Sequence, residues 1–597
     1  MSNTKTTSTG SKTFTSILAG AAKHPYIAAF MLCLILSMFF LGSVDNMGKY
    51  VPGIFFVFFC GLSAVIVSHI CTEKKRSNFL TAILTAAVCA AGAPLFLLFR
   101  STKNKILFLF AFCSIVILAL YFAFFTKKLA RRFNAMLIIG LGFVVKLCYV
   151  LGTSVYVRQH DTGWFGAKDE VIPGHLGYIS YLFHNHSLYN GDYRRYLQYC
   201  HPPLHHSLCA LWISFFNKVL GVKLDLAVES AQMLSLFWSM TIVITAYKIF
   251  RYFKLDGTAL YVPLIITAFH PCFTFLSSIM NNDPLAWALT LGAMYSTLMW
   301  YREPTLKNII KIAFCIGLGM MTKLSVGLIA PSVTIVFIAV LIKKRKDFLV
   351  KLLGQFAAFA AVCVPLGLWF PVRGLIRWGI PLTYVQELPE MTQTIKGTTF
   401  KERITDFSLY QFRRVFENWL SYDENGAPQS YNEHNPLIAF MKNSIFSEFI
   451  GEDNFSHYPF MLTVCKILFW LAAVIAAAAF IAMVVKLFRK CAADMVQKLF
   501  LISFHVILVG NLYMLSKNYT MVCSMNFRYI MPTVIIGSFF LGTTLISADK
   551  EGSARAKAVK YTSYIAVTAF ARALPSLSAE IRVVPRKNEP IITVGII

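Results

Sequence analysis

Charged side chains are scarce in this chain of 597 residues. Asp, Glu, Lys and Arg together make up 14% of it, whereas a soluble domain carries about 25%. Hydrophobic residues make up 57%, and many of them fall into runs of the ~17–25 residues that a helix needs to cross a bilayer. The scarcity of charge therefore excludes a soluble globular protein and predicts an all-α, polytopic membrane protein.

Acidic residues are the scarcer charge, with 28 Asp and Glu against 56 Lys and Arg, and the formal net charge is +28. A basic excess is also typical of nucleic-acid-binding proteins. Here the basic residues gather in short loops between apolar runs, such as 127–132 and 343–346, as the positive-inside rule describes for cytoplasmic loops. The excess therefore indicates membrane topology, and we expect no nucleic-acid partner.

Paired cysteines, a cleavable leader and internal repeats are also missing. The 14 Cys are scattered without any CxxC pair, so we expect neither a disulfide framework nor a cysteine zinc site. The apolar run at 25–42 is long for a signal-peptide core and lacks a small-x-small cleavage site, which favours a retained first span. The chain shows no internal repeat of the kind that many transporters carry.

The apolar runs predict about 14 transmembrane helices. They alternate across the bilayer when the basic loops face the cytoplasm, and Arg100, Lys103 and Lys105 are the exception that falls outside. One such exception is tolerable because the positive-inside rule is statistical. The expected spans are residues 25–42, 51–72, 79–99, 106–125, 133–157, 228–250, 258–280, 284–300, 308–322, 325–342, 351–370, 461–486, 497–516 and 529–546.

Residues 203–220 are apolar enough to resemble a further span. Counting them as a crossing would invert every later loop and would place the basic run 343–346 outside. We therefore expect a helix that lies in the outer interface or dips partway into the membrane.

The spans divide the chain into four parts. Two long outer loops accompany the predicted catalytic part, and ordered loops of such length are usually functional. The parts are a polar cytoplasmic N-terminus at 1–24, a four-helix membrane extension at 25–132, a catalytic membrane core at 133–546 with outer loops 158–226 and 371–460, and a C-terminal tail of unknown role at 547–597.

The first outer loop opens with an aspartate, Asp161, just beyond the end of a predicted span. A carboxylate at the boundary of membrane and water can be partly desolvated, which raises its pKa and suits it to general-base work. The alternative is a solvated loop carboxylate. His160 beside it favours function, and Asp169 and Glu170 are further catalytic candidates in the same loop.

Histidines and tyrosines are dense in that loop. His201 and His205 stand at a spacing that can ligate a metal on a helix, but Pro202 and Pro203 between them break the helix. The rival role is hydrogen bonding to lipid phosphate and sugar hydroxyls. We assign no cofactor with certainty and leave a divalent cation open. The candidate substrate-binding histidines are His160, His175, His201 and His205.

Carboxylate and cationic side chains recur at the other outer turns. Asp283 precedes Pro284, so it either caps the next helix or takes part in the site. Lys323 either snorkels to the interface or holds a phosphate as a point charge. Four cations at the outer rim run against the positive-inside trend, which points to an anionic partner such as a lipid phosphate. They are Lys323, Arg373, Arg377 and Arg528.

Lys146 lies in the middle of the predicted span 133–157. A charge at that depth is a candidate for function. Structural pairing inside the bundle is an equal alternative.

The outer-face motifs resemble those of the C-type glycosyltransferase superfamily (GT-C), specifically family 39-like enzymes, which include protein O-mannosyltransferases and the lipid A aminoarabinose transferase. The resemblance covers about residues 133–546. Two departures are the four additional spans before the core and Asn526, where relatives often have Asp. The motifs are Arg158-Gln159-His160-Asp161, His201-Pro202-Pro203-Leu204, Asn282-Asp283-Pro284-Leu285, Thr322-Lys323-Leu324-Ser325 and Asn526-Phe527-Arg528-Tyr529-Ile530-Met531-Pro532.

The resemblance implies that Asp161 serves catalysis and that a sugar moves, with inversion, from a polyprenyl-phosphate donor. The acceptor would be a hydroxyl of a glycan, lipid or protein, and Tyr529 would join the cations in binding substrate. We expect a multi-pass protein of a bacterial plasma membrane with its active site on the outer face. The rival hypotheses are a lipid or sugar transporter or flippase without transferase activity, which would show deep ionisable groups and repeats, and a structural scaffold.

Overall fold

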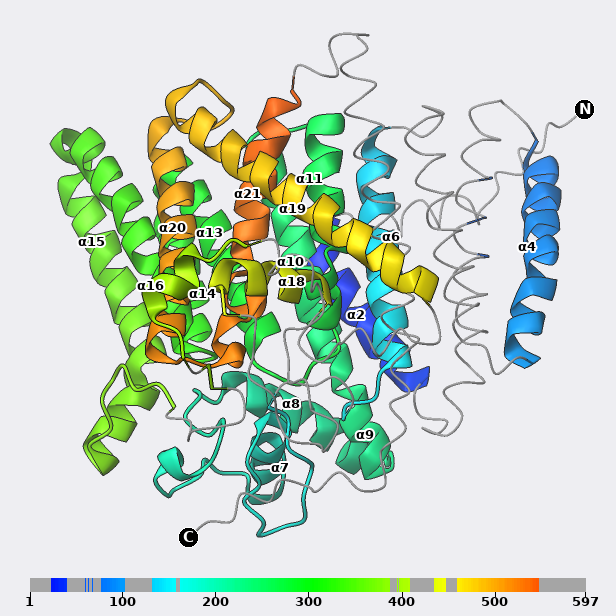
Figure 1. Ribbon diagram of the computed structural model, residues 1–597, viewed down its shortest axis with the longest axis horizontal. Coiled ribbons are helices and arrows are strands. Elements are labelled where there is room, and N and C mark those ends of the chain that lie inside the picture. The colour runs from blue at the N-terminus through cyan, green and yellow to red at the C-terminus, as the bar shows by residue number, and fades with distance from the viewer. Residues whose placement is uncertain are drawn as a thin grey trace, which may run out of the picture.

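The computed structural model, shown in Figure 1, describes residues 23–39, 60, 63, 67, 77–101, 131–156, 161–386, 394–395, 397–408, 434–446 and 459–546. Within these residues every regular element is a helix, and one isolated β-bridge pairs Thr394 with Met521. The all-helical expectation is therefore confirmed for the described part of the chain.

In the described part of the chain, five helical stretches are long and apolar enough to cross a membrane. They coincide with five expected spans: 228–250, 325–342, 351–370, 461–486 and 497–516. The expected span 106–125 lies outside the described residues, and 51–72 does so except at three isolated positions. The five stretches are Leu224–Tyr252, Leu324–Lys344, Phe348–Trp378, Lys466–Phe488 and Met495–Asn518.

The secondary-structure elements follow the apolar runs closely. Two of the long stretches, Leu324–Lys344 and Phe348–Trp378, fall largely within a single element, α15. The principal helices are α2 (Pro25–Phe39), α4 (Asn78–Ser101), α6 (Arg131–Gly152), α9 (Leu224–Ser230), α10 (Gln232–Tyr252), α11 (Thr258–Phe269), α13 (Asp283–Arg302), α14 (Leu306–Met320), α15 (Ala330–Trp378), α18 (Pro436–Phe446), α19 (Pro459–Phe488), α20 (Met495–Asn518) and α21 (Pro532–Thr544).

The expected span 258–280 is not one helix. It breaks after α11, and the short helix α12 (Pro271–Phe275) begins on the other side of His270. The reason is Pro271, because the residue before a proline is driven out of the helical region, and His270 has an extended ψ of 127°. The segment 276–282 then leads to the turn that begins α13.

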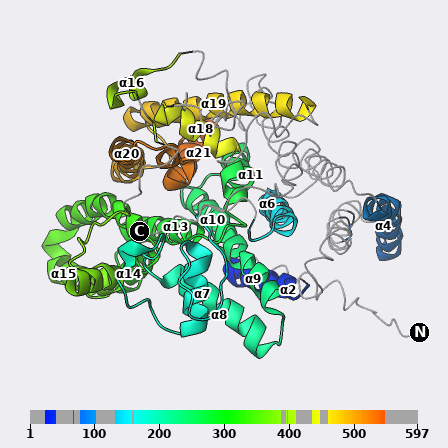
Figure 2. The same ribbon diagram turned by 60° about the horizontal axis from the view of Figure 1, so that its bottom comes forward.

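The helix α10 lies at the centre of the bundle. Burial within the protein covers 78% of the apolar window of Leu224–Tyr252 but only 17% of that of Phe348–Trp378. The helices α2, α6, α11 and α13 pack against α10, and Figure 2 shows α14 and α15 to one side of it and α6 and α11 to the other. The peripheral α15 therefore has apolar faces left for lipid, whereas α10 has few.

Two further helices lie together at one end of the bundle, α7 (His175–Asn185) and α8 (Leu204–Ser214), as Figure 1 shows. A π turn, Phe215–Val219, follows α8. Eleven residues of α-helix span about 16 Å, roughly half the thickness of the hydrocarbon core. Leu211 and Val219 are exposed there, at 66% and 69%. That 203–220 lies in the outer interface, without crossing the membrane, stays a prediction.

Candidate active site

The turn before α13 places Asp283 in the protein interior. Asn281 Oδ1 accepts a hydrogen bond from the Asp283 backbone N–H at 3.1 Å, and Pro284 occupies the first turn, where its fixed φ suits a helix. The N-cap of α13 is Asn282, without a side-chain capping bond, and Asp283 is the first residue of the helix. Of the two roles left open for Asp283, the capping role is therefore wrong. The carboxylate of Asp283 is left to bind other groups.

Lys323 is the first of these groups. It lies between α14 and the 3₁₀ helix η5 (Leu324–Ile329), and its Nζ donates to Asp283 Oδ1. The Asp283 side chain is 2% exposed and that of Lys323 14%. Lys323 therefore belongs to a buried ion pair. Removal of one partner of such a pair strongly destabilises the folded protein.

Arg528 is the second cation at Asp283. It lies in the 3₁₀ helix η8 (Phe527–Ile530), where Asn526 Oδ1 accepts from its backbone N–H at 2.9 Å and Trp287 Nε1 donates to its carbonyl at 2.8 Å. Its Nε is 3.8 Å from Asp283 Oδ2, and its Nη2 donates to the Tyr529 hydroxyl at 3.1 Å. The backbone contacts hold the guanidinium in place while leaving its donors for side chains and ligands.

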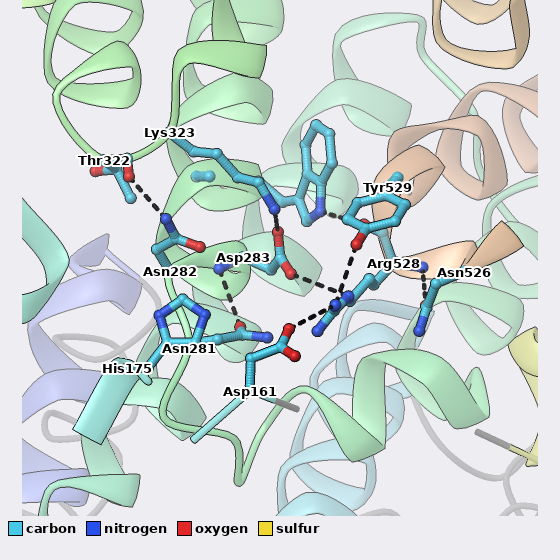
Figure 3. A network of polar contacts seen from close by, with 12 residues as sticks. Asp161, His175, Asn281, Asn282, Asp283, Thr322, Lys323, Asn526, Arg528 and Tyr529 are labelled. Carbon is cyan, nitrogen blue, oxygen red and sulfur yellow. Dashed lines mark hydrogen bonds and ion pairs between the residues drawn. The ribbon is translucent and has the colours of Figure 1, made fainter. Parts of the chain in front are cut away.

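Asp161 joins the same network from the first outer loop. Its Oδ2 accepts from Arg528 Nη2 at 3.2 Å, and its side chain is 47% exposed (Figure 3). Its φ of 52° is left-handed, a conformation that Asp tolerates. Its carbonyl accepts from the His175 backbone N–H at 2.8 Å, at the start of α7. The structure thus brings together two carboxylates and two cations from four distant parts of the sequence.

Histidines pack beside this network. His175 Nδ1 and His206 Nε2 are 3.0 Å apart, and the His175 ring stacks on that of His201 at 5.6 Å between centroids. Burial lowers the pKa of His201 to about 3 and that of His205 to about 4, and it holds the pKa of His175 and His206 well below the usual value. These four side chains are therefore neutral hydrogen-bonding groups at neutral pH.

The low pKa of His201 predicts how stability depends on pH. An unfolded histidine has a pKa of about 6.5, so below that pH the unfolded chain binds the proton more tightly than the folded one. The contribution of neutral His201 to the free energy of unfolding is complete above pH ~6.5 and is lost as the pH falls toward 3. We expect the melting temperature in detergent to fall between pH 7 and 5, and by less in His201→Asn, once each is referred to its own value at pH 7. An equal fall in both proteins would contradict this origin.

Among the described residues, no group of three or more His, Cys, Asp or Glu could hold a metal ion. Pro202 and Pro203 separate His201 from α8, and His205 Nε2 lies 3.6 Å from Cys209 Sγ. The histidines therefore stack on one another instead of converging on one point.

Other candidates lie elsewhere. Arg373 donates to the Tyr189 carbonyl at 2.9 Å, and Arg377 donates to Asn190 Oδ1, so both tie α15 to the first outer loop. Asp169 and Glu170 are exposed in a turn where Glu170 Oε2 accepts from the Ala167 N–H at 3.2 Å. His160 lies outside the described residues.

Lys146 is fully buried, and its Nζ donates to the Ala268 carbonyl near the end of α11. This contact links α6 to α11 where α11 breaks and accounts for the lysine structurally. Among the alternatives left open by the sequence, structural pairing inside the bundle is the one for which the geometry supplies a partner.

Sequence reasoning missed several residues around the network. Asn281 and Trp287 each contact a member of it, and His206 contacts His175 beside it. Glu229 accepts from Ser154 Oγ at 2.8 Å and from the Val155 N–H at 2.9 Å, six residues before Asp161. The string Asn281-Asn282-Asp283-Pro284 carried a signal, since an Asn two residues before a helix start commonly accepts from the backbone. Nothing in the sequence pointed to Trp287.

The fold and the network together define a multi-pass membrane protein with a charged site at the ends of its helices. Residues 201–369 match the family model described as dolichyl-phosphate-mannose-protein mannosyltransferase. That segment runs from His201 through Asp283 and Lys323 into α15. The match agrees with the resemblance found in the sequence: this segment of the chain is similar to a family of mannosyltransferases.

Comparisons with whole proteins are less close. No curated protein matches the chain. Among solved structures the chain is similar to the crystal structure of ArnT from Cupriavidus metallidurans in the apo state, with 13% sequence identity and a TM-score of 0.30. The similarity covers 69% of this chain and 78% of that one.

Proposed function

We propose that this protein transfers a sugar from a polyprenyl-phosphate donor to a hydroxyl acceptor on the outer face of the membrane. The observation that carries the proposal is the sharing of Arg528 between Asp161 and Asp283, with Lys323 on the far side of Asp283. A half-exposed carboxylate beside two nearly buried cations suits a general base next to a leaving phosphate. The name of the matching family, which includes a dolichyl-phosphate sugar, gives independent support.

The reaction requires one proton transfer and one displacement. Asp161 takes the proton of the acceptor hydroxyl as its oxygen attacks the anomeric carbon. The bond between that carbon and the phosphate oxygen breaks, the configuration inverts, and polyprenyl phosphate leaves with the electron pair. Arg528 and Lys323 stabilise the charge that develops on the phosphate, because fixed cations in a water-poor site need no reorganisation.

The proposal includes a GT-C architecture with about 14 crossings. The core at 133–546 would carry the site, the extension at 25–132 would flank it, and the loops 158–226 and 371–460 would face outward. Within the described residues, Ile395 N–H donates to the Thr520 carbonyl at 2.8 Å, and buried Arg403 donates to the Ser516 carbonyl at 2.8 Å. These two bonds join the second loop to residues 516 and 520, which precede Arg528 in the chain, and they support an acceptor-binding role for the loop.

Topology can be tested by labelling. In a cysteine-free background, Lys344→Cys should react with a membrane-impermeant thiol reagent only after the cytoplasmic side is opened, because Lys344 belongs to the basic run 343–346. Arg194→Cys, in the first outer loop and 44% exposed in its side chain, should react in intact cells. The reverse pattern would overturn the outward placement of the site.

Activity should be tested with the purified protein in lipid. Incubation with a radiolabelled polyprenyl-phosphate sugar and a hydroxyl acceptor should yield glycosylated acceptor and free polyprenyl phosphate in equal amounts. The competing function is a lipid transporter or flippase. Movement of the intact donor across vesicles, without release of polyprenyl phosphate, would support that alternative and contradict transfer.

A further inference from the structure

The amide of Asn281 has a known orientation. Its Oδ1 accepts from the backbone N–H of Asp283, and a backbone N–H can only donate. The oxygen therefore faces Asp283 and the nitrogen faces the other way. The side chain is buried, with the residue 1% exposed.

The Nδ2 of Asn281 is a buried donor without a hydrogen-bond partner in the part of the chain that the structure describes. Water does not reach it, and buried donors in proteins are almost always paired. Figure 3 shows this end of the amide pointing toward the carboxylate of Asp161. Asn281 Nδ2 is therefore an unused donor that points toward the Asp161 carboxylate, and that carboxylate is bound by Arg528.

Asp161 is bound by Arg528, and Arg528 has other partners. The same guanidinium lies 3.8 Å from Asp283 and donates to Tyr529. A phosphate that arrives at Arg528 competes with Asp161 for the Nη2 that now holds it at 3.2 Å. The main chain of Asp161 stays in place through the bond from the His175 N–H to its carbonyl, so only the carboxylate has to turn.

We propose that Asn281 is a positioning residue for Asp161, which takes over the carboxylate through Nδ2 when the donor phosphate draws Arg528 away. The inference rests on the proposed function, since it needs a phosphate at Arg528. Arg528 holds the carboxylate in the structure, and Asn281 orients it toward the acceptor once the donor is bound. Arg528 thus releases the Asp161 carboxylate, and Asn281 orients it, only when the sugar donor is bound.

The charges around Asp161 set what a pH profile reports. Opposite it and beside it the described residues contribute cations, a second carboxylate and two histidines that burial keeps neutral. Because Nδ2 donates to the carboxylate, it favours the charged form of Asp161, which is the form that acts as a base, in the loaded enzyme. The groups are Arg528 from η8, Lys323 before η5, Asp283 at the start of α13, His175 in α7, and His201 before α8.

The variant Asn281→Ser separates the two jobs of this side chain. A serine hydroxyl can still accept from the N–H two residues on, whereas it does not extend an amide donor to Asp161. We expect kcat to fall about tenfold, and the acid limb of the kcat profile to move up by about one pH unit, the equivalent of that factor. The donor KM should stay within about twofold of the wild-type value.

Asn281→Asp is the second variant. It keeps the side-chain shape and the oxygen that accepts from the Asp283 N–H, and it replaces the amide donor by a negative charge. It should lose more activity than Asn281→Ser. The control is Asn308→Ser, at the opposite end of α14, where a buried amide donates to the Glu303 carbonyl at 3.1 Å; its kcat profile should match the wild type.

Two results would overturn the inference in distinguishable ways. If the wild type transfers sugar but Asn281→Ser has an unshifted acid limb and near-wild-type kcat, the positioning role is wrong and the proposed function stands. A lowered kcat with an unshifted limb and a raised donor KM would assign Asn281 a structural role instead. If the wild type itself releases no polyprenyl phosphate, the proposed function fails and takes the inference with it.

Discussion

Asp161→Asn is expected to lower sugar transfer by about 10²–10⁴-fold, the usual contribution of a general base. The amide keeps the size and the hydrogen-bonding reach of the carboxylate but cannot accept the hydroxyl proton at neutral pH. Donor binding should be largely kept, because Lys323 and Arg528 supply the phosphate contacts. The measurement is transfer from a radiolabelled polyprenyl-phosphate sugar by purified protein in lipid, beside equilibrium binding of the donor.

The matched controls are Asp169→Asn and Glu170→Gln. Both residues are exposed in the same loop, where Glu170 Oε2 accepts from the Ala167 N–H, so both variants should retain most of the activity. Near-wild-type turnover by Asp161→Asn would rule out its role as base. The next candidates would then be Asp169, Glu170 and Asp283.

Arg528→Ala should weaken donor binding by about 10–100-fold, since a hydrogen bond to a charged group contributes roughly 1.5–3 kcal/mol. The loss should extend to kcat, because the leaving phosphate carries more charge than the bound donor. Arg528→Lys keeps the charge but removes the planar fork that reaches Asp161, Asp283 and Tyr529. Its affinity for the donor should therefore lie between those of the wild type and Arg528→Ala. For both variants the measurement is the affinity for polyprenyl phosphate, with the protein in nanodiscs.

Arg377→Ala provides the comparison for a cation outside the network. Arg377 donates to Asn190 Oδ1, and its removal should change donor affinity by less than about threefold, as expected for an exposed contact. If Arg377→Ala weakened donor binding as strongly as Arg528→Ala, the phosphate would have to lie nearer to the end of α15 than to Asp283.

Local sequence patterns predicted much of the helical framework. Long apolar runs must form helices in lipid, because each segment has to satisfy its own backbone hydrogen bonds. The five long apolar stretches accordingly fall on expected spans. The break at His270 was missed because hydropathy averages over a window, whereas a single proline acts on one residue before it. Pro271 is visible in the sequence, but the residues around it are mostly apolar, so the run was taken as one span.

The charged residues were recognised by type but not by partner. Position at an outer turn made Lys323, Arg373, Arg377 and Arg528 equivalent in the sequence, since each stands at the end of an apolar run. Folding separated them into two pairs. Lys323 and Arg528 meet at Asp283, whereas Arg373 and Arg377 meet the loop at Tyr189 and Asn190.

The sequence by itself indicated a membrane protein, most of its long helices and the residue types that stand at their ends. These properties depend on composition and on neighbours a few positions apart. Only the tertiary structure decided that Asp161 and Arg528, 367 positions apart, share one hydrogen bond, and that Asn282 rather than Asp283 stands at the N-cap of α13. Such pairings depend on how helices pack around α10, and the geometry of packing is a property of the whole bundle rather than of any one segment.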